Sequence, residues 1–396
     1  MRKIAVIFGL LFLPSFCAAQ CSTSASAAGV ISGVGTVECS IAAQVIGLEN
    51  VYCTKANSGE LTHGTPLWGA NDDVAALPTR CIYTGQDATP SPGNTVTATD
   101  SSDLASKLAA AACGDTIVLT AGTVYVGEFT LSKTCDAGHW ITIRTSELTN
   151  PSFPAQGVRA TPCLAGISND SVNGRDLPGY PDYSCPSYPT KLVATIKQGP
   201  GASDAAIQFG QNASHYRLIG IEVEKDPTHN ADSLIFMQPD GLTLGANNII
   251  FDRMLIHGVP WTPAAGTIDE TGNGIQAKNT QWVSLINSWV YDTYCNSSCV
   301  DSHDFGGGTG IYQDGPFKLY NNLMATGGES WMFGGGGQGP GTPNTADVEI
   351  RSNLSMKPLN WMVPIGSCIN YRDPVTKNLG EFKNMTLALL EGNVYR

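Results

Sequence analysis

The chain has 396 residues, of which only 14% are charged, and its formal net charge at pH 7 is -12. A basic footprint for nucleic acid is absent, and the acidic balance disfavours polyphosphates and anionic membranes as partners. The length does not set a number of domains, because a solenoid of repeats can extend over a chain of any length.

Residues 1–19 have the pattern of a secretory signal. Arg2 and Lys3 precede an apolar run that ends at Leu13, and small residues then predict cleavage after Ala19. The run is too short to span a bilayer, and no later segment has the apolar length that a membrane span needs. We therefore expect a secreted or periplasmic protein without a membrane span.

Twelve cysteines occur in the chain, one of them within the predicted signal. In an exported protein this number favours disulfides over a zinc site, for which paired Cys-x-x-Cys motifs and well-spaced histidines are lacking. Spacing alone leaves several connectivities open. Positions around single loops favour three pairs, namely Cys113 with Cys135, Cys163 with Cys185, and Cys295 with Cys299.

Two units follow the signal. Residues 20–93 form a Cys-containing segment rich in Ser, Ala, Gly and Thr, and a Pro-rich turn before residue 94 marks its boundary with the domain over 94–396. This domain opens with a predicted helix over 100–112 that places Leu104 and Leu108 on one face.

Short predicted strands follow this helix without further helices between them, at 114–119, 124–126, 129–131 and 140–144. This order excludes a doubly wound sheet and leaves a sandwich, a barrel or a β-solenoid. Similar phrases, each with a large apolar residue three positions before Asn or Ser, recur at 285–290, 319–324 and 350–354. Their spacing of roughly thirty to forty residues selects the solenoid. Asn322, Asn353 and Asn393 fall at its bends, where we expect them to hydrogen-bond from coil to coil.

The chain resembles secreted right-handed parallel β-helix proteins of the pectate-lyase-like superfamily, in particular a largely uncharacterised bacterial branch. The resemblance extends from about residue 100 to the end and is specific for the fold, not for a reaction. It is carried by residues 113–119, 140–146, 215–222, 251–253, 257–258 and 332–335. It implies an all-β right-handed parallel β-helix, cross-linked by disulfides, whose alanine-rich helix caps the N-terminal end of the core. Because the sequence stops inside a repeat phrase, we expect C-terminal coils to be missing.

The densest group of polar residues consists of Asp292, Asp301, His303, Asp304 and Glu329. Stacked coils would bring their loops to one side, where carboxylates raise one another's pKa values, supply an acid and a base, or bind a hard cation. Asp301, His303, Asp304 and Glu329 are therefore candidate catalytic residues. Asp292, Asp301 and Asp304 form a candidate calcium site. The competing interpretation is that Asp residues in glycine-rich loops cap turns.

Basic and aromatic residues complete the candidate site. Arg351 could stabilise the charge that develops when a lyase removes the proton beside a uronate carboxylate, or it could simply pair with a carboxylate on the surface. Trp261 and Trp331 could bind sugar rings, with core packing as the competing role. Further basic candidates without an assigned role are Arg253, Lys278, Lys318 and Lys357.

The sequence thus predicts an exported β-helix that acts on or binds an extracellular polysaccharide, an expectation that rests on fold analogy. Two classes remain open: an enzyme, either a polysaccharide lyase or a glycoside hydrolase, and a non-catalytic surface or adhesion protein. Phrases typical of characterised pectate lyases are absent. The enzyme hypothesis requires Asp301, His303 and Glu329 to converge in one groove. The sequence does not indicate an oligomeric state.

Overall fold

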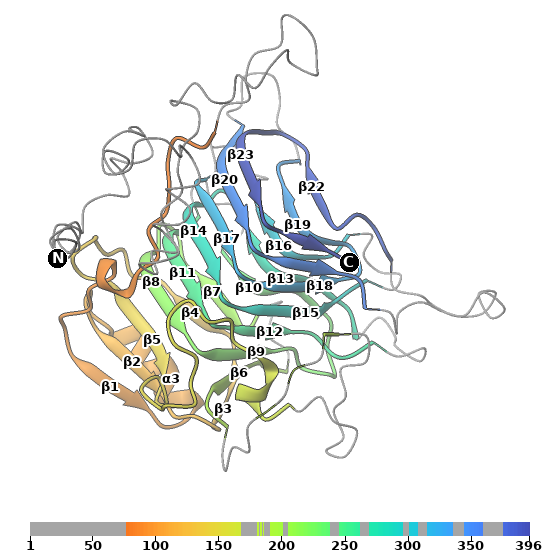
Figure 1. Ribbon diagram of the computed structural model, residues 1–396. Helices are drawn as coiled ribbons and strands as arrows, with labels where there is room; N and C mark the ends of the chain where they lie inside the picture. The colour runs from red at the N-terminus through yellow and green to blue at the C-terminus, as the bar shows by residue number, and fades with distance from the viewer. Residues whose placement is uncertain are drawn as a thin grey trace, which may run out of the picture.

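The computed structural model describes residues 77–167, 180, 181, 183, 185, 191–200, 205–237, 245–261, 269–295, 301–307, 315–335, 344–358 and 375–396. The predicted signal at 1–19 and most of the segment 20–93 lie outside these ranges. Within them the chain coils through three parallel sheets (Figure 1), which is the predicted right-handed parallel β-helix. No helix in the described part of the chain is long and apolar enough to cross a membrane.

Each complete coil contributes one strand to each sheet. The nine-stranded sheet consists, in order, of β1 (Thr95–Ala98), β2 (Thr116–Leu119), β5 (Ile141–Thr145), β8 (Ser214–Ile219), β11 (Asn247–Asp252), β14 (Gln281–Ile286), β17 (Phe317–Tyr320), β20 (Thr345–Arg351) and β23 (Met385–Glu391). The eight-stranded sheet consists of β3 (Val124–Gly127), β6 (Ala194–Gln198), β9 (Ile221–Glu224), β12 (Leu255–His257), β15 (Trp289–Thr293), β18 (Leu323–Thr326), β21 (Leu354–Met356) and β24 (Val394–Tyr395). The seven-stranded sheet consists of β4 (Phe129–Leu131), β7 (Ile207–Phe209), β10 (Ala231–Phe236), β13 (Thr271–Ala277), β16 (His303–Gly307), β19 (Glu329–Phe333) and β22 (Gly380–Phe382).

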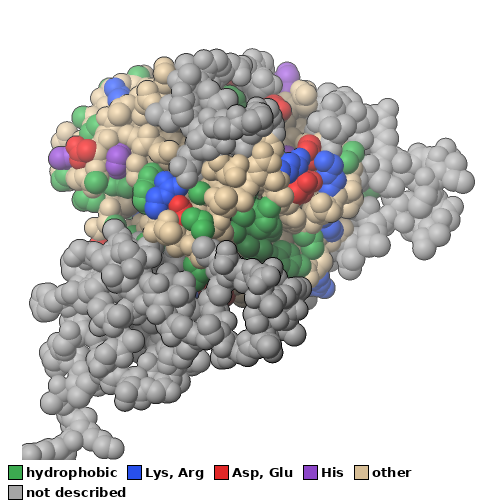
Figure 2. All heavy atoms as spheres, turned by 90° about the horizontal axis from the view of Figure 1, so that it is seen from above, with side chains coloured by type: hydrophobic (Ala, Val, Ile, Leu, Met, Phe, Trp, Pro, Cys, Tyr) green, Lys and Arg blue, Asp and Glu red, His purple; other side chains and the backbone are tan. Residues whose placement is uncertain are grey.

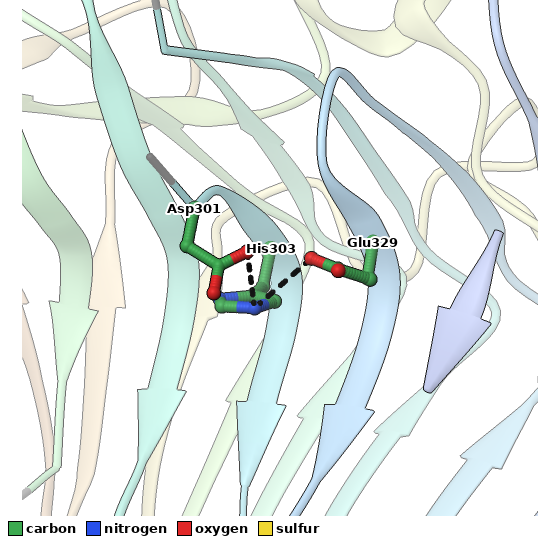
Figure 3. A group of neighbouring side chains, drawn as sticks. All are labelled: Asp301, His303 and Glu329. Carbon is green, nitrogen blue, oxygen red and sulfur yellow. Dashed lines mark ion pairs between the residues drawn. The ribbon is translucent and has the colours of Figure 1, made fainter. Parts of the chain in front are cut away.

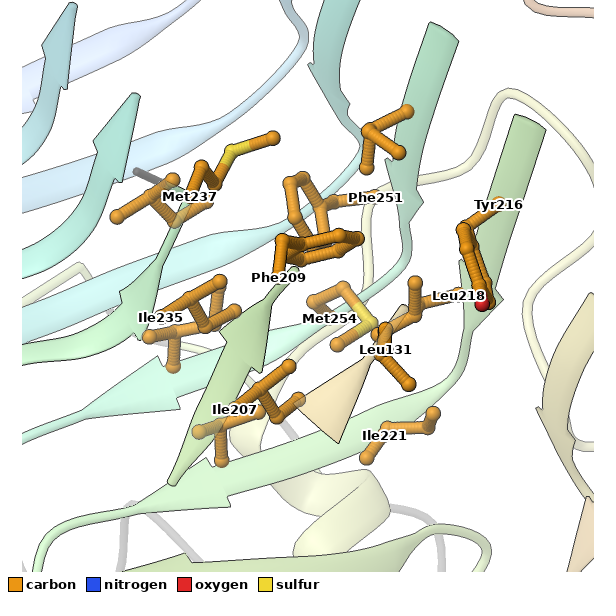
Figure 4. Packing of buried hydrophobic residues seen from close by; sticks show 14 of the residues in the cluster. Leu131, Ile207, Phe209, Tyr216, Leu218, Ile221, Ile235, Met237, Phe251 and Met254 are labelled. Carbon is orange, nitrogen blue, oxygen red and sulfur yellow. The ribbon is translucent and has the colours of Figure 1, made fainter. Parts of the chain in front are cut away.

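Side chains of the same kind stack inside the coils. Ile207, Ile235, Ile275 and Phe305 occupy equivalent positions on β7, β10, β13 and β16, and all of them are buried in one continuous apolar core. Figure 4 shows part of this interior, where residues of all three sheets meet. Because each coil buries its apolar face only against its neighbours, the core grows along the helix axis.

Helix α3 (Ser101–Ala110) covers the N-terminal end of this core, as predicted. The carboxylate of Asp100 accepts a hydrogen bond from the backbone N–H of Asp103 at 2.9 Å and so caps the helix start. Leu104 and Leu108 are buried against β1, β3 and β4. Two short 3-10 helices, η4 (Gln86–Ala88) and η5 (Pro162–Ala165), complete the helical structure of the described residues.

The bend between the nine-stranded and eight-stranded sheets explains the recurring sequence phrase. Asn287, Asn321 and Ser352 adopt positive φ angles of 55°, 55° and 56° at this bend. Asparagine tolerates this left-handed conformation better than most residues do. The residue that follows each of them begins or precedes the next strand.

The predicted asparagine ladder is formed at this bend. Asn322 Oδ1 accepts the backbone N–H of Ser288 at 2.9 Å, Asn353 Oδ1 accepts that of Asn322 at 2.9 Å, and Asn393 Oδ1 accepts that of Asn353 at 3.0 Å. The amide nitrogen of Asn322 also donates to the carbonyl oxygen of Leu285 at 2.8 Å. The ladder therefore satisfies buried backbone groups that the bend leaves outside the sheets.

Disulfides and the N-terminal segment fasten the outside of the coils. Cys113–Cys135 and Cys163–Cys185 are formed, as expected. Cys295 is also disulfide-bonded, but its predicted partner Cys299 lies outside the described residues, so this pairing stays a prediction.

The segment before β1 crosses the outer face of the nine-stranded sheet. Arg80 Nε donates to Asp347 on β20 at 2.6 Å, the Lys318 ammonium on β17 donates to the carbonyl oxygen of Ile82, and Arg217 on β8 donates to that of Thr84 at 2.9 Å. The segment thus covers charged side chains of the sheet and provides them with hydrogen-bond partners. Where charge reaches the surface seen in Figure 2, basic and acidic side chains adjoin in small groups.

A buried ion pair lies on the outer face of β9. Glu222 Oε1 is 3.1 Å from His257 Nε2, Oε2 is 3.8 Å from the Lys191 ammonium, and Thr195 donates a hydrogen bond to the same carboxylate. Burial alone would raise the pKa of Glu222, but His257, Lys191 and Thr195 together lower it to about 2. The carboxylate is therefore charged in the folded protein at every pH above that value.

We expect Asn322→Ala to destabilise the fold by about 1–3 kcal/mol, because it leaves the Ser288 N–H and the Leu285 carbonyl buried without partners. The free energy of unfolding in urea measures this loss. Asn230→Ala, at an exposed asparagine, serves as the control. Equal stability of the two variants would contradict a structural role for the ladder.

Acid should unfold the protein partly through Glu222. Because its folded pKa is depressed, the ion pair stabilises the fold fully above the ordinary value of 4.5, and this contribution declines as the pH falls towards 2. We expect Glu222→Gln to lower the free energy of unfolding by about 3 kcal/mol at pH 7. The stability of this variant should also decline less as the pH falls, which urea unfolding at several pH values measures. Glu224→Gln on the same strand should keep the wild-type pH dependence.

Candidate active site

The parallel register brings distant polar residues side by side on the outer face of the seven-stranded sheet. Ser233, Asn273, His303 and Glu329 occupy equivalent positions on β10, β13, β16 and β19. His303 and Glu329 each begin their strand, and Asp301 lies two residues before His303. Figure 3 shows the side chains of Asp301, His303 and Glu329 turned towards one another from neighbouring strands.

The three side chains are within ion-pair distance. His303 Nε2 is 3.6 Å from Asp301 Oδ1 and 3.3 Å from Glu329 Oε2. The ammonium group of Lys377 is 2.6 Å from Asp301 Oδ1 and 3.8 Å from Glu329 Oε1. The Glu329 side chain is only 1% exposed, whereas that of Asp301 is 30% exposed. Within this group, Glu329 is therefore buried, whereas solvent can reach Asp301.

Asn273 determines which nitrogen of His303 carries a proton. The amide nitrogen of Asn273 donates to the carbonyl oxygen of Asp232 at 3.0 Å, which fixes the orientation of the amide. Its Oδ1 consequently faces His303 Nδ1 at 2.9 Å and accepts a hydrogen bond from it. In the neutral imidazole the free lone pair is thus on Nε2, the nitrogen that faces the two carboxylates.

Electrostatics within the group follow from these contacts. Burial alone would raise the pKa of Asp301, but Lys377, Glu329 and His303 lower it below its usual value. The hydrogen bond to Asp301 raises the pKa of Lys377. Asp301 is therefore ionised and paired with an ammonium group at neutral pH.

A second lysine, Lys357, binds the turn that precedes Glu329. The Lys357 ammonium donates to the carbonyl oxygens of Thr326 at 3.1 Å and Gly327 at 3.0 Å, and also to that of Gly328. Burial lowers the pKa of Lys357 to about 8, although the nearby Asp304 and Glu329 carboxylates oppose this effect. Lys357 thus fixes the turn that leads into Glu329.

A cleft of about 390 Å³ opens beside the group, and Asp301 and His303 form part of its wall. Lys278 and Lys383 also line it. Lys278 directly follows β13 and Lys383 directly follows β22, with β16 and β19 between these strands. Neighbouring strands lie about 4.8 Å apart, so the two lysines follow strands that are roughly 14 Å apart. Both lysines follow the C-terminal ends of their strands, whereas His303 and Glu329 begin theirs, so the basic groups line the cleft further along the strand direction.

The structure separates Asp304 and Asp292 from this group. Strand pairing is regular at His303 and again from Phe305, but it skips Asp304, whose side chain accepts a hydrogen bond from Thr293 Oγ1 at 2.5 Å. Burial raises the pKa of Asp304 well above its usual value. Asp292 accepts a hydrogen bond from the Tyr180 hydroxyl at 2.9 Å.

The structure therefore does not bring the expected calcium set of Asp292, Asp301 and Asp304 together. Within the described ranges, the one group of three acidic, histidine or cysteine side chains close enough to share a metal ion is Asp301, His303 and Glu329. An imidazole and two carboxylates fit calcium poorly, because calcium takes about six to eight oxygen ligands.

Three other predicted residues lie away from the cleft. Arg351 is on β20 of the nine-stranded sheet, where it contacts Glu349 at 3.0 Å and Glu391 at 2.7 Å, so the ion-pair alternative holds. Trp331 points into the core and packs against Phe382 with ring centroids 4.6 Å apart. Trp261, after β12, is buried too. Neither tryptophan offers a broad face to a sugar.

The sequence does not single out Asn273, Lys377 or Lys383 as site residues. Asn273 precedes His303 by 30 residues, which is about one coil, so the repeat period could have found it. Lys377 lies 76 residues beyond Asp301, and no sequence pattern links the two.

No protein-family model and no curated protein sequence matches the chain. Among solved structures it is similar to an alginate lyase from Paenibacillus sp. strain FPU-7, with 14% identity, a TM-score of 0.33 and coverage of 76% of this chain and 98% of the other. It is similar to pectate lyase Pel9A, with 12% identity, a TM-score of 0.42 and coverage of 70% and 58%. A mannuronic-acid-specific family 6 polysaccharide lyase from human gut microbiota gives 11% identity, a TM-score of 0.32 and coverage of 76% and 59%.

The chain thus spans less than two thirds of the length of the second and third of these proteins. At these identities and TM-scores the similarities assign neither a substrate nor a reaction to this chain.

We expect Lys357→Met to destabilise the protein by about 1.5–3 kcal/mol, since three backbone carbonyls would lose a charged donor. Thermal or urea unfolding measures the effect. Lys383→Met, at an exposed lysine of the cleft, should leave stability within about 0.5 kcal/mol of wild type. An equally small loss in Lys357→Met would show that water replaces the ammonium group.

Proposed function

We propose that this protein is an exported enzyme that cleaves an acidic polysaccharide bound across the seven-stranded sheet. One observation carries the proposal: Asp301, His303 and Glu329 converge at a cleft that Lys278 and Lys383 flank. Two disulfides agree with export, because such bonds persist in oxidising compartments.

The arrangement favours β-elimination. In this reaction a base takes the proton from the carbon beside a uronate carboxylate, a carbon–carbon double bond forms, and the bond to the leaving sugar oxygen breaks. His303 Nε2 is the proposed base, because Asn273 holds the proton on Nδ1. Asp301 and Glu329 would stabilise the imidazolium that forms. Lys278 or Lys383 would neutralise the substrate carboxylate, whose negative charge increases in the transition state.

Glycoside hydrolysis fits the same residues less well. It needs two carboxyl groups about 5–9.5 Å apart with a sugar or a water molecule between them. Here the imidazole Nε2 lies 3.6 Å from one carboxylate and 3.3 Å from the other, so it occupies the space that the sugar would need. No step is assigned to calcium, for which the donor set is a poor fit.

We expect the protein to release unsaturated products from at least one acidic polysaccharide in a panel of uronate-containing and neutral chains. Absorbance of the new double bond and reducing ends are followed together. His303→Ala should lower kcat/KM by about 10²–10⁴-fold, the usual contribution of a positioned proton-transfer group. Lys278→Met and Lys383→Met should raise KM for the acidic substrate.

His139→Ala is the matched control, because this exposed histidine also contacts a carboxylate, Asp136 at 2.9 Å, on a different part of the surface. Reducing ends without unsaturated products would establish a hydrolase instead. Binding without turnover would support the surface or adhesion alternative. Turnover that survives His303→Ala would refute the proposed base.

A further inference from the structure

We propose that Asp301, His303 and Glu329 bind a divalent transition-metal ion of the zinc type, and that the Lys377 ammonium group competes with the ion for this position. The proposal is independent of the polysaccharide proposal, because it concerns binding by the protein alone.

Distances between the donor atoms match a metal site. Nε2 of His303, Oδ1 of Asp301 and a carboxylate oxygen of Glu329 lie within 4.8 Å of one another. Zinc bonds of about 2.1 Å at tetrahedral angles place neighbouring donors about 3.4 Å apart. The two separations from Nε2 are 3.6 and 3.3 Å. A small cation could therefore bind with little movement of these side chains.

Unsatisfied buried atoms provide a second, independent indication. Neither carboxylate oxygen of Glu329 has a hydrogen-bond partner, and His303 Nε2 has none either. Glu329 is 1% exposed and His303 is 5% exposed. Buried polar atoms nearly always have a hydrogen-bond partner, and leaving one unpaired costs about 1–3 kcal/mol. A cation between these atoms would satisfy all three.

Asn273 prepares the histidine for this role. A metal-binding imidazole usually donates its other N–H to a neighbouring acceptor, which fixes the tautomer and the ring orientation. Asn273 Oδ1 accepts this hydrogen bond at 2.9 Å, and the carbonyl oxygen of Asp232 holds the amide in place. The Nε2 lone pair is thereby directed to the two carboxylates.

Ligand chemistry selects the class of ion. Imidazole nitrogen combined with carboxylate oxygen suits zinc, iron or cobalt better than calcium or magnesium. Asp301 is partly exposed at the cleft, so water can complete the coordination.

Lys377 lies where it would compete with the ion. Its ammonium group is 2.6 Å from Asp301 and 3.8 Å from Glu329, and its side chain is 34% exposed and can turn outwards into solvent. The ammonium offsets part of the charge of the two carboxylates, and an ion that binds there has to displace it. Removing this lysine should therefore strengthen metal binding, which a nonspecific surface site would not show.

The test is calorimetric titration of the metal-stripped full chain with Zn²⁺, together with the visible absorption of added Co²⁺, which reports its coordination geometry. We expect one site with an imidazole ligand. Lys377→Met should tighten binding at least tenfold, Asn273→Ala should weaken it about 10–100-fold, and His303→Ala should abolish it. His139→Ala, which removes an exposed His–Asp pair, should bind as wild type does.

Circular dichroism establishes that each variant is folded, and Asp301→Asn, at a partly exposed position, replaces any His303 variant that fails to fold. Unchanged binding in both His303→Ala and Asp301→Asn would overturn the proposal, as would absence of binding in wild type and Lys377→Met alike. Both outcomes are measured by metal titration in the absence of a polysaccharide substrate. Failure of the metal site is thus distinguishable from failure of the polysaccharide proposal, which is judged by turnover of the metal-free protein.

Discussion

Coil-to-coil register places the core residues, the asparagine bend and the candidate site. Parallel pairing places each residue beside its equivalent one coil earlier and one coil later, so a column of side chains forms wherever equivalent positions share a chemistry. Inside the coils this gives columns of isoleucine and phenylalanine. At one bend it gives the asparagine ladder. On the outer face of the seven-stranded sheet it gives Asn273, His303 and Glu329 in a row.

Charged groups are buried in several places, but they differ in how many hydrogen-bond and ion-pair partners they have. Asp252 contacts Arg217 at 2.7 Å and Arg253 at 2.9 Å, and Glu222 contacts His257 and Thr195. These carboxylates are fully paired and serve the fold. Glu329 is equally buried, yet neither of its oxygens has a hydrogen-bond partner. Asp304 and Glu349 each leave one buried carboxylate oxygen without a hydrogen bond, whereas Glu329 leaves both. Native proteins tend to violate the rule of polar satisfaction at functional sites.

The two proposed roles of the His303 group involve the same lone pair. A free Nε2 can accept a proton from a bound sugar, whereas a metal ion on Nε2 would prevent that transfer. Lys377 influences the balance, since its ammonium group offsets carboxylate charge without occupying the imidazole nitrogen. In these two proposals the group acts as a base with the lysine in place and would be blocked when a metal ion displaces the lysine.

The sequence alone predicted the coil architecture and the asparagine ladder, and it favoured two of the disulfide pairs; the capping role of the helix came from the family resemblance. These features depend on local patterns that repeat in every coil or on cysteines around single loops. It also located Asp301, His303 and Glu329, because they fall near the starts of consecutive repeats. Which polar side chains face the cleft follows from the packing of the coils and not from the sequence pattern. Asp304 accepts a hydrogen bond from Thr293 away from the cleft, Trp331 belongs to the core, and Lys377 reaches Asp301 from 76 residues away. Side-chain direction at an irregular strand start depends on its neighbours in space, which the order of residues does not specify.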